Sequence, residues 1–460
     1  MKSVEQIYTG CLAQGAYFIE SDGEAAVIDP LRETKPYMQR ALERGVKIKY
    51  IFETHFHADF VSGHVDLAEK TGATIVYGPT ANTSFKSHIA TDGEEFKIGN
   101  LTLKALHTPG HTPESTTYLL IDENGKEQAI FTGDTLFIDD VGRPDLAQKA
   151  NEVSQEDLAG WLFDSLRTKI MPLPDHILVF PAHGAGSACG KNMSNETSDT
   201  LGRQKQSNYA LRNDMTREEF IHEVTDGLLP PPQYFAKNAM LNKEGYASFD
   251  KVMEQGSRPL TVEEFEAYSH EDDMLILDVR HQKDFVKGYI PGSIFIGIDG
   301  SFAPWVGVLI PDINQKIILI ANEGREEEAV MRLSRVGYDN ALGYLQGGFN
   351  AWKTSGKPVA EIKSIDVATF NSIREQNPEL NILDVRKPNE WDKSHIGSAS
   401  HFPLDFLNDH MSEINQSDEY YLHCRSGYRS TIAASILKAR GYHHLVDVIG
   451  SFDDIIAAET

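Results

Sequence analysis

The sequence of 460 residues predicts an α/β protein built from one larger domain followed by two copies of a smaller one. Short apolar runs rich in β-branched residues recur along the chain and alternate with helical stretches. In the second half, the segment 274–293 is echoed by the segment 380–399, and both contain Leu-Asp-Val-Arg. A repeat of this length indicates two copies of one domain, each with a parallel sheet and crossover helices.

The composition excludes several classes of protein. The chain carries 43 Lys and Arg against 68 Asp and Glu, and its net charge of −25 argues against nucleic acid and anionic membranes as partners. No apolar run approaches the roughly 18 residues that a membrane span requires, and the first residues lack a signal-peptide pattern. The 3 cysteines are scattered and do not form a disulfide framework. We therefore expect a cytoplasmic protein.

The order of the segments predicts three domains, over residues 1–250, 257–360 and 362–460. In the first of these, polar residues follow strand-like runs at four places. The residues that can bind a metal there are His55, His57, Asp59, His111, Asp134 and His183. Histidines two positions apart on a loop can converge on one cation, so the sequence predicts a metal site in the first domain.

This order of clusters, an H-x-H-x-D motif and then a distant His, an Asp and a final His, resembles the metallo-β-lactamase superfamily. The resemblance implies an αββα sandwich. In the dinuclear hydrolases of that superfamily the residue after the motif's Asp binds a second metal, whereas this sequence has Phe60 there. An aromatic ring cannot coordinate such a cation, so we expect one metal held by His55, His111 and Asp134. Two His and one carboxylate match the facial triad of non-haem Fe(II) oxygenases, although zinc also accepts these ligands.

Four longer runs, THFHADFVSGH, GHTPEST, FTGDTLFIDDVGRPDL and FPAHGAGSACG, resemble the persulfide dioxygenases, a branch of the same superfamily. The resemblance implies one Fe(II) per dioxygenase domain, bound by His55, His111 and Asp134. It makes His57, Asp59 and His183 groups that orient the ligands. It also implies that Arg143 and Cys189 lie near the substrate.

The last domain presents a cysteine where a strand-like run meets a helix-like run. Cys424 follows Tyr420 to His423, and a helix N-terminus at this place favours the thiolate, a sulfur nucleophile. The surrounding sequence resembles the rhodanese sulfurtransferases, which implies that Cys424 carries a persulfide sulfur. A cysteine phosphatase has its Arg six residues after the Cys, whereas Arg429 comes five after Cys424. The loop residues expected to contact substrate are Arg425, Ser426, Gly427, Tyr428 and Arg429.

The middle domain has no nucleophile at the matching position. Aligning the two copies places Ala321 opposite Cys424, and glutamates follow it in place of cationic and hydroxyl residues. A methyl group cannot form a persulfide. We therefore interpret residues 257–360 as an inactive rhodanese that orients the outer domains.

The full order of domains is similar to the bacterial persulfide dioxygenase-sulfurtransferase fusions of the CstB type. That resemblance implies oxidation of a thiol persulfide by O2 to sulfite, then transfer of sulfur by Cys424 to give thiosulfate. The carrier thiol is coenzyme A, cysteine, bacillithiol or glutathione, and we expect a homo-oligomer. Two alternatives remain open: a zinc-dependent thioester hydrolase of the glyoxalase II kind, and rhodanese modules that bind or sense rather than catalyse.

Overall fold

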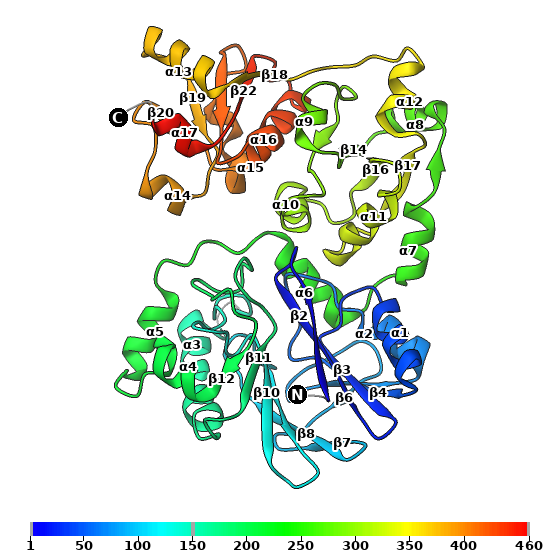
Figure 1. The fold of residues 1–460 in the computed structure, drawn as a ribbon, viewed down its shortest axis with the longest axis vertical. Coiled ribbons are helices and arrows are strands. Elements are labelled where there is room, and N and C mark those ends of the chain that lie inside the picture. The colour runs from blue at the N-terminus through cyan, green and yellow to red at the C-terminus, as the bar shows by residue number, and fades with distance from the viewer. Residues whose placement is uncertain (1–2, 149–151, 458–460) are drawn as a thin grey trace. The chain divides into compact units, whose positions relative to one another are not determined.

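The computed structural model describes residues 3–148 and 152–457. The chain divides into two compact units, Met1–Phe249 with Ser334–Gly337 and Asp250–Leu333 with Tyr338–Thr460 (Figure 1). Among the described residues, no helix combines the length and the apolar character that crossing a bilayer requires.

The first unit contains two six-stranded sheets. The first sheet mixes antiparallel and parallel pairs in sequence order: β1 (Val4–Thr9), β2 (Gln14–Ser21), β3 (Glu24–Ile28), β4 (Lys47–Phe52), β5 (Thr74–Tyr77) and β6 (His88–Ile89). The second sheet is antiparallel except for the pair β10 and β11, and it comprises β7 (Glu95–Ile98), β8 (Leu101–His107), β9 (Thr116–Ile121), β10 (Glu127–Gly133), β11 (Leu178–Pro181) and β12 (Asp199–Thr200).

Alternating apolar residues stack these sheets face to face. In β2, Tyr17 and Ile19 belong to a core shared with residues of the second sheet, whereas Ala16 and Phe18 belong to a core on the outer face. Successive side chains of a strand point to opposite faces, so one strand serves both cores. The α-helices described in this unit are α1 (Lys35–Arg44), α2 (His64–Thr71), α3 (Gln155–Ser165), α4 (Leu201–Ser207), α5 (Arg217–Thr225) and α6 (Tyr234–Glu244).

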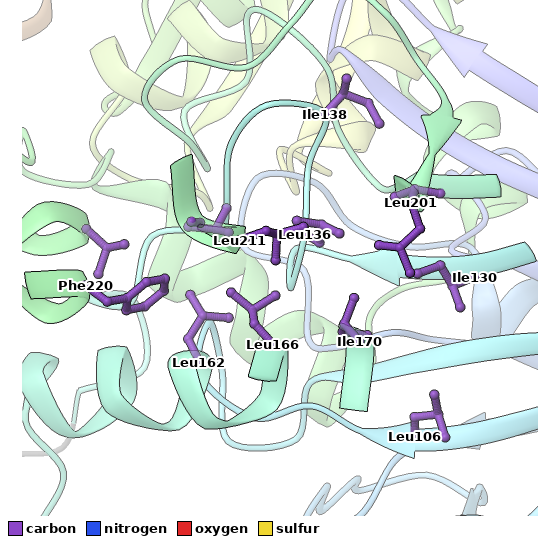
Figure 2. Close-up of a cluster of buried hydrophobic side chains, with 14 of the residues drawn as sticks. Leu106, Ile130, Leu136, Ile138, Leu162, Leu166, Ile170, Leu201, Leu211 and Phe220 are labelled. Carbon is purple, nitrogen blue, oxygen red and sulfur yellow. The ribbon is translucent and has the colours of Figure 1, made fainter. Parts of the chain in front are cut away.

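The outer core of the second sheet joins it to α3 and α5. Leu162 of α3 and Phe220 of α5 pack with Leu106 of β8 and Ile130 of β10, all of them buried (Figure 2). On the other side, Tyr37 of α1 and Leu67 of α2 pack with the first sheet. The layers therefore run helix, sheet, sheet, helix, which confirms the predicted αββα sandwich.

The second unit contains two five-stranded sheets in which all paired strands are parallel. The first has the order β13-β17-β16-β14-β15, with β13 (Pro259–Leu260), β14 (Met274–Asp278), β15 (Ile294–Phe295), β16 (Lys316–Ile320) and β17 (Ala341–Leu345). The second has the order β18-β22-β21-β19-β20, with β18 (Lys363–Asp366), β19 (Ile382–Asp384), β20 (Ala399–His401), β21 (Tyr420–His423) and β22 (Leu445–Ile449).

The two strand orders are the same, position by position, which confirms the predicted pair of parallel-sheet domains. The helices of the first copy are α8 (Val262–Ser269), α9 (Gln282–Phe285), α10 (Phe302–Leu309), α11 (Glu326–Arg335) and α12 (Gly348–Thr354), and α7 (Phe249–Gly256) precedes them. Those of the second copy are α13 (Val367–Gln376), α14 (Pro388–Lys393), α15 (Leu407–His410), α16 (Tyr428–Ala439) and α17 (Phe452–Ala457). The exact domain limits given above stay predictions.

Candidate metal centre and cysteine site

The three residues predicted as metal ligands come together at one edge of the sandwich. His55 follows β4 of the first sheet, whereas His111 follows β8 and Asp134 follows β10 of the second. Each offers a buried ligand atom, and these atoms all lie within 4.8 Å of one another. Oδ2 of Asp134 is 3.4 Å from Nε2 of His111 and 3.8 Å from Nε2 of His55. One cation of ordinary size can therefore contact all three.

The far nitrogens of both imidazoles are already engaged, which orients the near ones. Nδ1 of His111 lies 2.8 Å from the carbonyl oxygen of Arg143, and that oxygen can only accept. The proton of His111 is therefore on Nδ1, and the lone pair of Nε2 faces Asp134. Nδ1 of His55 lies 3.0 Å from the hydroxyl of Thr54. Such partners fix the tautomer of a metal-binding imidazole.

The electrostatics also fit a cation. Burial lowers the pKa of His55 well below its ordinary value, and the neighbouring His57, His111 and His183 add to this, so the imidazole is neutral as a ligand must be. Both carboxylate oxygens of Asp134 are buried, and neither has a hydrogen-bond partner within the described part of the chain. A buried carboxylate of this kind is costly unless a cation compensates it.

A second buried cluster contains His57, Asp59 and His183, the groups predicted to orient the ligands. Their ligand atoms also lie within 4.8 Å of one another. Nε2 of His183 is 3.4 Å from Asp59 and 3.6 Å from Asp134. Burial lowers the pKa of His183, but these two carboxylates outweigh it and raise the pKa to about 9. His183 therefore links the second cluster to the first.

Phe60 fills the place next to this second cluster. Its side chain is completely buried, and its ring centre is 4.3 Å from that of His57. The ring offers no ligand atom. Among the described residues, the second cluster therefore has the ligand atoms of His57, Asp59 and His183, and position 60 adds none.

Asp29, which the sequence reasoning missed, anchors both histidines of the H-x-H motif. It follows β3 with a φ of +48°, a conformation uncommon for a residue other than glycine. Its carboxylate accepts from the backbone N–H of Thr54 at 2.8 Å and from the Thr54 hydroxyl at 2.9 Å. It also lies 3.1 Å from Nε2 of His57. The signal that could have pointed to it is an Asp directly after a strand, in the run Ile28-Asp29-Pro30.

Arg143 is occupied by the protein itself. Its guanidinium forms a bidentate ion pair with Asp145, at 2.6 and 2.7 Å, and donates to the carbonyl oxygens of Ala188 and Leu229. Only 6% of the residue is exposed. Its observed part in the site is the carbonyl that holds His111, and its contact with substrate stays a prediction.

Cys189 lies beside the metal centre. Its sulfur, Asp134 and His183 form a third group whose ligand atoms lie within 4.8 Å. Burial raises the pKa of Cys189 well above its ordinary value, and Asp59 and Asp134 raise it further. The thiol is therefore protonated in the metal-free protein. Its role with substrate stays a prediction.

Cys424 lies in the turn between β21 and α16, as the sequence predicted. The backbone N–H of Gly427 donates to its sulfur at 3.1 Å, and the hydroxyl of Ser430 is 3.7 Å away. Gly427 has a φ of +87°, which the tight turn requires and which side-chain-bearing residues rarely adopt. Only 2% of Cys424 is exposed, so the loop encloses the thiol.

The predicted substrate-binding residues of this loop have different surroundings. Arg425 and Ser426 are exposed, whereas Arg429 pairs with both carboxylate oxygens of Glu390 in α14. Burial opposes ionisation of Glu390, yet Arg429 lowers the pKa of Glu390 to about 2. The hydroxyl of Tyr428 donates to the carbonyl of Gly297 at 2.7 Å. Contact of these residues with substrate stays a prediction.

A buried carboxyl group behind the loop was not anticipated from the sequence. Asp447 of β22 accepts a hydrogen bond from the hydroxyl of Thr431 at 2.8 Å, and Ser430 also hydrogen-bonds to it. Burial raises the pKa of Asp447 to about 6, and these hydroxyls only partly counteract it. A lone Asp inside a β-branched run has no distinctive sequence pattern, so only the fold reveals it.

The middle domain repeats the geometry of this loop without its sulfur. Ala321 follows β16 as Cys424 follows β21, and the φ of Gly324, +83°, matches that of Gly427. Ala321 is 4% exposed. The backbone turn is thus common to both copies, and the nucleophile is present in one.

Comparison with known proteins identifies both kinds of domain. A family model described as the metallo-beta-lactamase superfamily matches residues 9–183, and the rhodanese-like domain matches residues 261–355 and 367–458. The human mitochondrial persulfide dioxygenase ETHE1 is 32% identical over 212 residues, which cover 46% of this chain and 74% of that protein. This chain belongs to the metallo-β-lactamase superfamily.

It is a member of that superfamily with rhodanese-like domains attached. A crystal structure of a metallo-β-lactamase from Staphylococcus aureus subsp. aureus COL is 34% identical with a TM-score of 0.66, covering 74% of this chain and 98% of that one. A probable hydroxyacylglutathione hydrolase of Schizosaccharomyces pombe is 30% identical over 182 residues, 38% of this chain and 66% of that protein. The superfamily domain thus resembles both oxygenases and hydrolases, and the attached rhodanese-like domains are where Cys424 lies.

Proposed function

We propose that this chain oxidises low-molecular-weight thiol persulfides with O2 at a mononuclear Fe(II) site and then forms thiosulfate at Cys424. The observation that carries the first step is the convergence of His55, His111 and Asp134, with Phe60 in place of a further ligand. The sequence similarity to a persulfide dioxygenase supports this first step. Iron bound there would supply the activation of O2 and open positions for substrate.

The protein's own groups hold this site ready. The Arg143 carbonyl and the Thr54 hydroxyl keep the Nε2 atoms of His111 and His55 directed at Asp134. Phe60 is completely buried beside this site and offers no ligand atom. The reaction balances as R–S–SH + O2 + H2O giving R–SH, sulfite and two protons.

The second step belongs to Cys424. Its thiolate attacks the outer sulfur of a second persulfide, so that a new S–S bond forms and the thiolate R–S⁻ leaves. Sulfite then attacks the same outer sulfur, which gives thiosulfate and restores the Cys424 thiol. The Gly427 N–H, 3.1 Å from the sulfur, stabilises negative charge on it in both directions. Tethering the two sites raises the effective concentration of sulfite at Cys424.

A single assay tests both steps. We expect iron-loaded protein to consume O2 with thiol persulfides and to release sulfite and thiosulfate. Cys424→Ser should leave O2 consumption intact and abolish thiosulfate, with sulfite accumulating instead. Unchanged thiosulfate in that variant would remove the transfer role from Cys424.

The second candidate is a zinc-dependent thioester hydrolase with rhodanese modules that bind or sense. It is favoured by the similarity to a probable hydroxyacylglutathione hydrolase and by the suitability of two His and one Asp for zinc. Purified protein with full zinc occupancy, thioester hydrolysis and no O2 uptake would establish this function and reject the first.

A further inference from the structure

A cavity of about 390 Å³ lies in the middle domain at the place that Cys424 holds in the last one. It is bounded by the loop after β16, by residues around α9 and by the start of α12. The residues that the argument uses are Arg280, Asp284, Lys287, Ala321, Glu323 and Lys353. Ala321 stands where the last domain has Cys424, so this cavity lacks the thiol that would form a persulfide.

Ala321 lines the cavity at the position that matches Cys424. In the last domain the Gly427 N–H donates to the sulfur of Cys424 at 3.1 Å. Gly324 has the same backbone turn, but the matching residue is Ala321, whose methyl group accepts nothing. Among the described residues, none accepts a hydrogen bond from the Gly324 N–H. Gly324 is exposed and is not among the residues that line the cavity, whereas Ala321 lines it, so a ligand's sulfur can lie against Ala321.

The wall of the cavity is built as in the active copy. The Arg280 guanidinium is clamped by Asp278, at 2.6 Å, and lies 4.3 Å above the ring of Phe349. Arg386 repeats this arrangement with Asp384 and Phe452, at 2.6 and 3.4 Å. The arrangement of Arg, Asp and Phe is therefore common to both copies, and in the middle domain its Arg280 and Phe349 line the cavity.

The rim carries charges of both signs. Lys287 and Lys353 contribute positive charge, whereas Asp284 and Glu323 contribute negative charge. In the described part of the chain, none of these four side chains forms an ion pair. A ligand with a single sign of charge would pair with one set and face the other unpaired. A zwitterion pairs with both.

We propose that this cavity binds a zwitterionic aminothiol acid, that is, a thiol with an α-ammonium and an α-carboxylate group, without forming a covalent bond. The carboxylate pairs with Lys287 and Lys353, the ammonium with Asp284 and Glu323, and the sulfur lies over Ala321. The inference rests on the proposed function, which makes small thiols substrates of this chain, and it selects amino-acid thiols among them.

Isothermal titration of the full-length, iron-loaded protein with L-cysteine under anaerobic conditions tests the proposal. The matched probes are 3-mercaptopropionate, which lacks the ammonium, and cysteamine, which lacks the carboxylate. We expect each analogue to bind about fivefold more weakly, since an exposed ion pair contributes up to about 1 kcal/mol. Equal binding of all three, or no binding at millimolar concentration, would overturn the proposal.

Variants locate the site on the chain. Lys287→Ala combined with Lys353→Ala should weaken L-cysteine binding about fivefold or more. Lys283→Ala changes a lysine of α9, four positions before Lys287, that does not line the cavity, and it should leave binding unchanged. Glu323→Gln should remove most of the advantage of L-cysteine over 3-mercaptopropionate. Full binding in the double lysine variant would place the ligand elsewhere and contradict the inference.

The outcome is separable from that of the proposed function. Loss of L-cysteine binding in the double variant with persulfide-dependent O2 consumption retained supports the cavity as a site distinct from the metal centre. Binding of L-cysteine to a protein that consumes no O2 with any persulfide would support the cavity and reject the oxygenase. O2 consumption without any cysteine binding would reject the cavity alone.

Discussion

The hydroxyl of Thr54 connects Asp29 to the Nδ1 atom of His55, so it orients a predicted metal ligand without touching the metal. Thr54→Val keeps the shape of the side chain and removes both hydrogen bonds. We expect iron affinity to fall about 10- to 100-fold, as measured by competition with a chelator. Thr54→Ser keeps the hydroxyl and should stay near the parent value. Equal losses in both variants would show that packing, not orientation, is the role of this residue.

Phe60 stands where we predict that a ligand for a second metal is missing. Phe60→His would place an imidazole beside Asp59 and His183, whose ligand atoms are already close together and buried. We expect the metal content of purified protein to rise from one to two ions per chain in elemental analysis. Phe60→Leu opens similar space without a ligand and should retain one ion. A second ion in the leucine variant would mean that the ring does not exclude it.

Asp447 makes the stability of the last domain dependent on pH. Its pKa of about 6 exceeds the roughly 3.9 of an unfolded Asp, so the folded state binds the proton more tightly. Its contribution is therefore most favourable at low pH and is lost as pH rises through about 4 to 6, by about 2 kcal/mol between pH 4 and 7.

Asp447→Asn should remove this dependence. Hydrogen exchange of the α16 amides, compared with the parent protein at each pH, should show the variant gaining relative protection as the pH rises. Asp453→Asn changes an exposed carboxylate of α17 and serves as the control. A variant-to-parent ratio that does not change with pH would contradict this account of Asp447.

Helix α3 supports the loop that carries His111. Gly110 has a φ of +149°, and a Cβ atom there would lie 2.4 Å from the backbone of Leu162. The hydroxyl of Ser165 also donates to the carbonyl of Pro109 at 2.7 Å. The element that forms the outer layer of the sandwich therefore also positions a predicted ligand.

Gly110→Ala should push α3 and the His111 loop apart. We expect a loss of about 1–3 kcal/mol in the free energy of unfolding, together with weaker iron binding. Gly125 also has a positive φ, +76°, but open space around it, so Gly125→Ala should destabilise the protein without affecting iron. Normal iron affinity in Gly110→Ala would separate α3 from the metal centre.

At the scale of elements, the sequence predicted more of the architecture than of the polar partners. The repeat of Leu-Asp-Val-Arg predicted two parallel sheets of the same topology, because apolar runs and turns are local signals. Clustered motifs likewise placed His55, His111 and Asp134 near one another. The roles of Asp29, Thr54 and Asp447 were not predicted, since their partners come from distant strands. The ion pair between Arg143 and Asp145 was not predicted for another reason. Two residues of one loop can face each other or face a ligand, and the sequence does not distinguish these cases.

The whole chain has a charge of −25, which repels anionic substrates at a distance. Raising ionic strength from about 0.05 to 0.5 M shortens the Debye length to a few ångströms and should raise kcat/KM for an anionic persulfide about two- to fivefold. A zwitterionic persulfide should change little. Steady-state O2 consumption with the two substrates provides the comparison, and an increase of equal size for both would point to a salt effect on the protein itself.

Gly324 and Gly427 occupy matching turns in the two rhodanese-like copies. In both copies the parallel strand passes into the helix through a glycine with positive φ, whether or not the loop carries a thiol. The backbone turn is therefore independent of the side chain at this position. One amino acid decides whether the loop carries a nucleophilic sulfur. The same polypeptide therefore contains this turn twice, once with the thiol of Cys424 and once with the methyl group of Ala321.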